Sequence, residues 1–192
     1  MTAPHRNTYH HGDARAALVQ AAFDLARAGG PPTVTLRAAA RHVGITAAAV
    51  YRHFTTVEEL LEVVKRRALR LLAERLDEAV SLSEGEGAGG GEPAAPDRTR
   101  TRAIAEAYLS FAREHPGLFG MACHGGLTAA RDLVAEHVGD APRPTRLAVW
   151  SAAHGVALLS VSEAEQRQVL DILLAGIVAP SAESGPVISW RP

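Results

Sequence analysis

Apolar residues recur at three- and four-residue intervals along most of the chain, which is the periodicity of amphipathic α-helices. The first such segment follows Asp13 and contains Leu18, Ala21, Ala22 and Leu25. It ends at a Gly-Gly-Pro-Pro run, a strong helix-stop signal. The pattern predicts an all-α protein that begins with an amphipathic helix.

Two short helices are predicted next, on either side of a glycine. Thr35 can cap the first of them, and Gly44 supplies the backbone freedom that a helix C-terminus uses. Thr46 can cap the second, which we expect to end near His53. The spacing predicts a helix-turn-helix over residues 35–53 and, with the first helix, a three-helix domain.

A long helix follows, and a change of composition ends it. Thr56 and Glu59 fit a capping box, and an apolar stripe then continues as far as Leu76. Residues 81–97 are rich in Gly, Ser and Glu and cannot bury a face, so they are predicted to form a flexible loop.

Helical patterns return at residue 98 and continue to a stop at Pro180. Residues 145–160 are apolar on most sides, and Ser162 with Glu165 fits a second capping box. The predicted organisation is a helix-turn-helix domain at 1–54, a connecting helix at 55–80, the loop at 81–97, a C-terminal helical domain at 98–180 and a loose tail at 181–192.

Composition and charge agree with this division. The net charge is −1, but residues 1–54 contain six arginines and two aspartates, a local charge of +4, whereas residues 81–192 have a charge of −4. Such asymmetry is expected when only one domain meets phosphate. The polar N-terminus is not a secretory signal, no apolar run spans a bilayer, and there is one cysteine, so a cytoplasmic location without a membrane partner is expected.

The predicted helix-turn-helix leaves small, basic and hydrogen-bonding side chains on its outer side. A major groove admits one helix, and alanines allow a close approach to the bases. The expected contacts to double-stranded DNA are Thr35, Arg37, Thr46, Ala47, Ala48, Tyr51, Arg52, His53 and Thr55.

The same segment closely resembles the DNA-binding domain of the TetR (tetracycline-repressor-like) family. The matching motifs are Tyr9-His10-His11-Gly12, Thr35-Leu36-Arg37, Gly44-Ile45-Thr46, Val50-Tyr51-Arg52-His53-Phe54 and Glu58-Glu59-Leu60-Leu61. The resemblance implies a transcriptional regulator, by default a repressor, that binds a pseudo-palindromic operator. One position departs from the family: Val57 stands where many members have a phosphate-contacting lysine.

Trp150, His154 and Gly155 are similar to the Trp-His-Gly signature of one subgroup of that family, which implies a C-terminal domain for ligand sensing and dimerisation. A small-molecule effector, of unknown identity, is expected. The candidate pocket residues mix apolar bulk with polar groups, although each also suits an ordinary core. They are Tyr108, Phe111, Phe119, Met121, Cys123, His124, Trp150 and His154.

The last two predicted helices carry more apolar surface than one chain of this size buries readily. A homodimer covers such surface, and a two-fold operator also requires one. The expected dimer interface contains Leu158, Val169, Ile172, Leu173, Gly176 and Ile177.

Other functions have weaker support in the sequence. The nine histidines show no metal-binding spacing, and a Cys123-based nucleophile has no evident orienting partner. No cofactor, metal or catalytic residue is therefore expected. The alternatives that stay open are an adaptor that does not bind DNA and, less favoured, an enzyme that uses the C-terminal pocket.

Overall fold

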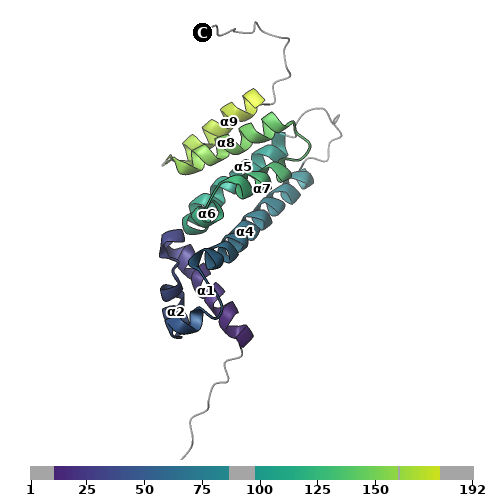
Figure 1. Ribbon diagram of the computed structural model, residues 1–192. Coiled ribbons are helices and arrows are strands. Elements are labelled where there is room, and N and C mark those ends of the chain that lie inside the picture. The colour runs from purple at the N-terminus through teal and green to yellow at the C-terminus, as the bar shows by residue number, and fades with distance from the viewer. Residues whose placement is uncertain (1–10, 87–97, 160, 178–192) are drawn as a thin grey trace, which may run out of the picture. The chain divides into compact units, whose positions relative to one another are not determined.

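The computed structural model describes residues 11–86, 98–159 and 161–177 (Figure 1). These residues form helices and no strand, as the apolar periodicity predicts. The elements are α1 (His11–Gly29), the 3-10 turn η1 (Pro31–Thr33), α2 (Leu36–Val43), α3 (Ala47–Val50), α4 (Val57–Glu86), α5 (Arg98–Glu114), α6 (Pro116–Ala122), α7 (Thr128–Val138), α8 (Arg143–Leu158) and α9 (Glu163–Ile177).

The chain divides into two units, and α4 and α5 each contribute to both. The first unit combines the part of the chain up to Leu72 with residues 111–130, and the second combines residues 73–110 with the part from Arg131 onward. The first unit therefore holds α1, α2, α3 and α6, and the second holds α8, α9 and most of α7.

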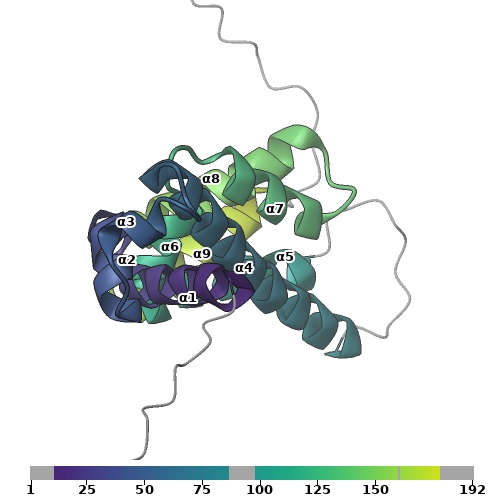
Figure 2. The ribbon, with the colours of Figure 1, turned by 60° about the horizontal axis from the view of Figure 1, so that its bottom comes forward.

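The first unit is built around α1. This helix packs against α2 and α6, and α2 packs against α3 (Figure 2). Its buried side chains recur at helical spacing, at Ala14, Leu18, Ala21, Ala22 and Ala26. Because most of them are alanines, neighbouring helices can approach the α1 backbone closely.

The closest approach in this unit is at Gly117, near the start of α6. A Cβ atom added there lies only 2.2 Å from the Ala26 carbonyl oxygen and 2.8 Å from that of Arg27. Both obstacles are backbone atoms at the end of α1, which cannot move aside cheaply. Pro116 begins α6 after α5 ends at Glu114, and the absence of a side chain at Gly117 allows α6 to pack closely on α1.

The prediction of a loop from residue 81 is wrong for Ser81–Glu86, which continue α4 as helix. Two serines in this turn bond to the helix carbonyls, Ser81 Oγ to Asp77 O at 2.9 Å and Ser83 Oγ to Val80 O at 2.7 Å. Glu84 pairs with Arg100 of α5 at 3.0 Å. The ion pair with α5 supports this last turn against the weak helix preference of the Ser- and Gly-containing sequence. Residues 87–97 lie outside the described part of the chain.

In the second unit α8 and α9 lie side by side and pack against each other (Figure 1). Each contributes a narrow row of buried apolar residues, such as Val149 and Ala153 from α8 and Leu170 and Leu174 from α9. The predicted capping box of α9 is present: Ser162 Oγ accepts from the Glu165 amide at 3.3 Å, and Glu165 Oε2 accepts from the Ser162 amide at 2.8 Å. The Ser162 hydroxyl also donates to Glu165 Oε2 at 2.7 Å, and this bond, together with the one from the Ser162 amide, lowers the pKa of Glu165.

Within the described part of the chain, no helix has the length and the run of apolar residues needed to cross a bilayer. The Tyr9-His10 segment and the predicted tail at 181–192 lie outside the described residues. His11 and Gly12 belong to α1, but their side chains are also outside what the structure describes.

Candidate nucleic-acid interface

Both ends of α2, the first helix of the helix-turn-helix, are capped by hydrogen bonds that the sequence predicts. Thr35 Oγ1 accepts from the Ala38 amide at 3.0 Å. At the other end Gly44 has a φ of 77°, the left-handed conformation that favours glycine. The amide of Gly44 bonds Arg41 O at 3.3 Å, and the amide of Ile45 bonds Ala40 O at 3.0 Å. This pair of bonds is a Schellman motif, and it fixes the direction in which the chain enters α3.

α3 is shorter than predicted. Thr46 caps it, accepting from the Ala49 amide at 3.2 Å, but the regular helix covers only Ala47–Val50. The chain then continues as a tight turn in which the amides of His53 and Phe54 both bond Val50 O, at 2.8 and 3.0 Å. Sharing one carbonyl in this way tightens the last turn, so it departs from α geometry before His53.

Two fully buried side chains, Val50 and Phe54, fix this segment to the unit. The Arg15 guanidinium lies 4.6 Å from the centre of the Phe54 ring and 3.9 Å from Glu59. Such a cation–π contact stabilises by about 0.5–1 kcal/mol at an exposed site. Apolar packing and an arginine of α1 therefore hold the α3 segment in place.

The outward side carries the residues that the sequence proposes for DNA. Eight of them are exposed: Thr35, Arg37, Thr46, Ala47, Ala48, Tyr51, Arg52 and Thr55. His53 is half-buried. Tyr51 has 61% of its surface exposed, which is unusual for a large aromatic side chain. The structure thus brings these residues to the surface in one short segment, and their role in binding DNA stays a prediction.

The start of α4 shows what surrounds Val57. Glu59 N donates to Thr56 Oγ1 at 3.2 Å, as in the predicted capping box, but the Glu59 carboxylate accepts from the Thr55 amide at 3.0 Å rather than from Thr56. Val57 is half-buried, whereas Thr55 and Thr56 are exposed. The hydroxyl of Thr55 is therefore at the surface beside the position of the absent lysine.

The eight candidate pocket residues are divided between the two units. Phe111, Phe119, Met121, Cys123 and His124 belong to the first unit, and Tyr108, Trp150 and His154 belong to the second. Phe111 packs edge-on against His115 at 5.4 Å, and the exposed His124 offers its carbonyl to Lys65 Nζ at 2.6 Å. Phe119 and Met121 are buried, and Cys123 is half-buried.

The three residues in the second unit contact one another, and Tyr108 and His154 are buried whereas Trp150 is half-buried. Tyr108 Oη and His154 Nδ1 share a hydrogen bond of 2.9 Å, and the Trp150 ring stacks on His154 with centroids 5.0 Å apart. Burial lowers the pKa of His154 below its ordinary value of 6.5. The Trp150 Nε1 atom is buried and has no acceptor among the described residues.

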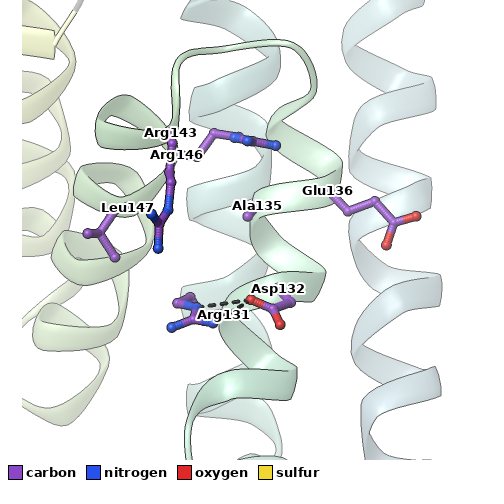
Figure 3. A pocket seen from close by; sticks show the side chains of 7 residues that line it. All are labelled: Arg131, Asp132, Ala135, Glu136, Arg143, Arg146 and Leu147. Atoms are coloured by element: carbon purple, nitrogen blue, oxygen red, sulfur yellow. Dashed lines mark hydrogen bonds and ion pairs between the residues drawn. The ribbon is translucent and has the colours of Figure 1, made fainter.

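A cavity of about 500 Å³ lies elsewhere in this unit, and none of the eight candidates lines it (Figure 3). Three arginines do, Arg131, Arg143 and Arg146. Sequence reasoning missed them because arginine on a helix usually belongs to a solvated face. One signal was present: Arg143 and Arg146 open a helix, where the helix dipole disfavours cations.

The proposed dimer residues differ in exposure. Leu158 and Ile172 are among the most exposed large apolar side chains, at 67% and 72%. Gly176 is exposed, and Val169 and Leu173 are half-buried. Ile177 ends α9, but its side chain lies outside the described residues. Sequence pattern alone identifies the helix faces, and the structure separates the outward residues from those that pack within the chain.

Comparison with known families agrees with the geometry of the first unit. Residues 18–64 match the model for bacterial regulatory proteins of the tetR family. The matched segment contains α2, the Gly44 turn, α3 and the start of α4. It therefore covers the helix-turn-helix and excludes the C-terminal half.

Solved structures extend the likeness to most of the chain. A protein of unknown function from Rhodococcus sp. RHA1 is 24% identical, with a TM-score of 0.65 over 91% of this chain and 100% of its own. A TetR-family transcriptional regulator from Streptomyces coelicolor is 22% identical, with a TM-score of 0.55 over 86% and 99%. The multidrug binding protein EbrR, solved with imidazole, is 18% identical, with a TM-score of 0.55 over 94% and 100%.

These likenesses establish the fold: an N-terminal helix-turn-helix domain joined by a long helix to a C-terminal helical domain. The comparison with curated proteins gives no match.

Proposed function

We propose that this protein is a ligand-responsive transcriptional regulator, a repressor that binds a pseudo-palindromic DNA operator as a homodimer in the cytoplasm. The observation that carries the proposal is the outward face of the helix-turn-helix. Its exposed side chains are small, cationic or hydrogen-bonding, and its apolar residues face inward. The match of residues 18–64 to the tetR-family model supports the same reading.

The face suits a major groove by shape. Ala47 and Ala48 are exposed and have only a methyl group, so the α3 segment can approach base edges closely. Alanine methyls can also contact the thymine methyl group. Because few side chains here reach far, we propose that specificity depends strongly on DNA shape as well as on direct base contacts.

The polar residues around α3 suit phosphate. Thr35 and Thr46 each accept a backbone amide through Oγ1, so the hydroxyl proton remains available to a phosphate oxygen. Among the described residues no carboxylate pairs with Arg37 or Arg52, so both guanidinium groups are available to DNA. We propose that Tyr51 and His53 add phosphate contacts, and that Thr55 partly replaces the lysine absent at Val57.

The second half of the proposal is the dimer. Leu158 and Ile172 present large apolar side chains to solvent, and a Cβ added at Gly155 or Gly176 meets no atom within 4 Å. A second copy related by a two-fold axis covers such surface, and it places two reading segments on the two halves of one operator.

The effector is the third element. The EbrR structures contain imidazole and ethidium, which shows that a protein of this fold binds small molecules. In this chain the Trp150–His154 stack lies in the segment that resembles the Trp-His-Gly subgroup, and with buried Tyr108 it gives the second unit an aromatic cluster that contains a polar hydrogen bond. We propose that an effector bound in this unit releases the operator.

The test begins with selection of binding sites by the purified full-length protein from random-sequence duplex DNA. We expect a pseudo-palindromic consensus, and a binding constant that falls steeply with salt in fluorescence anisotropy. Arg37→Gln should weaken binding about tenfold, because one charged contact to DNA is lost. The matched control is Arg66→Gln on α4, an exposed arginine that contacts Glu62 at 3.8 Å and is not part of the reading face.

Equal loss of affinity in both variants would contradict the proposed face, because it would show only a general effect of charge. Failure to enrich any sequence, with no salt-sensitive affinity for duplex DNA, would overturn the regulator and favour an adaptor.

A further inference from the structure

The cavity between α7 and the first turn of α8 has an unusual lining (Figure 3). Arg131 on α7 faces it, and so do Arg143 and Arg146 on α8. Ala135 and Leu147 add apolar surface. Its volume, about 500 Å³, lies within the usual range of small-molecule sites. Three guanidinium groups in the lining favour a negatively charged ligand.

Two of these three arginines form no ion pair with the acidic groups of the lining. Asp132 is committed to Arg131, whose Nη2 and Nε lie 2.8 and 3.0 Å from the same carboxylate oxygen. The Glu136 side chain points to the side of α7 away from α8 in Figure 3. No carboxylate in the described part of the chain pairs with Arg143 or Arg146. The lining therefore has three cations and two carboxylates, and the guanidinium groups of Arg143 and Arg146 make no ion pair with either carboxylate.

Arg146 also has an unmet hydrogen-bonding need. Its Nε atom is buried and has no acceptor within hydrogen-bonding distance among the described residues. A buried donor on a charged group is costly to leave without an acceptor. A ligand oxygen in the cavity would satisfy the guanidinium, because this group presents its donors in a fork that matches carboxylate and phosphate.

The position of the arginines on α8 adds to the positive potential. Arg143 is the first residue of this helix and Arg146 lies in its first turn. The helix N-terminus has no acidic residue in that turn, and its N-cap, Pro142, makes no side-chain hydrogen bond. Cations at this end of a helix oppose its dipole, whereas a bound anion interacts favourably with both.

We propose that this cavity binds a small organic anion. Its carboxylate or phosphate group contacts Arg143 and Arg146, and its apolar part lies against Leu147 and Ala135, of which Leu147 is 47% exposed. The binding site stands on the second unit alone. That this anion is the effector rests on the proposed function.

The experiment is isothermal titration calorimetry on the full-length protein with three probes of similar size: benzoate, phenyl phosphate and the uncharged benzyl alcohol. We expect saturable binding of at least one of the two anions, with one site per chain, and no saturable binding of benzyl alcohol. Preference between the anions identifies the head group. Arg146→Gln and Arg143→Gln should each weaken binding about tenfold, the usual effect of losing one charged hydrogen bond.

Arg70→Gln is the matched control, because Arg70 is exposed on α4 and does not line the cavity. Since Arg143 is exposed, its variant should keep the fold even if Arg146→Gln does not, and circular dichroism checks both. The absence of saturable binding by both anions, or equal affinity in all variants, overturns the site. DNA binding is measured separately without probes, so failure there overturns the regulator and leaves the anion site standing.

Discussion

The outward face of the helix-turn-helix and the outward faces of α8 and α9 differ in the side chains that they expose to solvent. The first exposes small, polar and charged side chains, and the second exposes large apolar ones. Around α3 the exposed side chains are alanine, threonine, tyrosine and arginine, and the apolar anchors Val50 and Phe54 are fully buried. On α8 and α9 the exposed side chains include Leu147, Leu158 and Ile172, and Leu159 is exposed directly after α8. The first face suits a polar, charged partner, and the second suits apolar surface of the same kind.

This difference shows that exposure alone does not identify a partner. A partner is indicated where a face leaves backbone groups without hydrogen bonds or apolar side chains in water. Around α3, Thr46 and the Gly44 turn supply hydrogen bonds to the backbone groups at the helix ends, so this face needs no partner to be stable. The α8–α9 pair leaves large apolar side chains in water, a cost that a second chain removes.

The largest effect is expected where an apolar contact becomes a buried charge. Ile172→Glu should convert the proposed dimer to monomer, because a carboxylate buried without a partner costs about 3–5 kcal/mol. Light scattering over a concentration series measures the mass. Ile172 is 72% exposed in the single chain, so the substitution spares the monomer fold. Leu82→Glu on α4, also an exposed leucine at 67%, is the matched control and should stay dimeric. A dimeric Ile172→Glu protein would exclude this face as the interface.

A charge on the other face should act only on DNA. Ala48→Glu should weaken operator affinity about 100-fold, because the side chain blocks close approach and its carboxylate repels phosphate. Fluorescence anisotropy with the selected operator measures this loss, and light scattering should show an unchanged dimer. Ala129→Glu, at an exposed alanine in the first turn of α7, is the control and should bind as the wild type does. Similar losses in the two variants would mean that α3 does not read the duplex.

The close packing of α6 on α1 in the first unit can be tested by substitution of Gly117. Gly117→Ala should lower the free energy of unfolding by about 1–3 kcal/mol, because the new methyl group meets the α1 backbone. Gly120→Ala in the same helix is the control: its Cβ would lie 3.5 Å from Pro31 Cδ, an ordinary contact. That variant should be neutral or up to about 1 kcal/mol more stable. Urea unfolding compares them, and equal stabilities would show that α6 can move off α1.

The smallest effect is a pH dependence in the second unit. Burial lowers the pKa of His154, so as the pH falls below its ordinary value of 6.5 the unfolded chain takes up a proton before the folded protein does. Stability should therefore be full above that value and decrease below it. Urea unfolding at about pH 7.5 and pH 5.5 measures the difference. His154→Gln should reduce this difference, and an unchanged pH dependence would place its origin in other groups.

The features that could be predicted from the sequence are those that depend on residues close together in the chain. The caps at Thr35, Thr46 and Ser162 and the left-handed glycine at Gly44 appear where expected, because each depends on a few consecutive residues. The end of α4 was missed, because its last turn depends on a contact between Glu84 and Arg100, 16 residues apart.

The candidate sites divide in the same way. The exposed residues of α3 could be predicted because helical period alone separates inward from outward positions. The arginine-lined cavity could not, because Arg131 of α7 and Arg146 of α8 come to line one cavity only in the folded protein. The close approach at Gly117 was missed for the same reason: its neighbours in space, Ala26 and Arg27, are about 90 residues earlier in the chain.

The two threonine caps restrict which residues can replace them. Serine, threonine, aspartate and asparagine all serve as N-caps. If Thr35 and Thr46 also face phosphate as proposed, aspartate preserves the helix and repels the DNA, whereas serine and asparagine keep both an acceptor for the amide and a donor for the phosphate. Thr46→Asp therefore separates the two roles in one protein: a folded, dimeric chain that can no longer hold its operator.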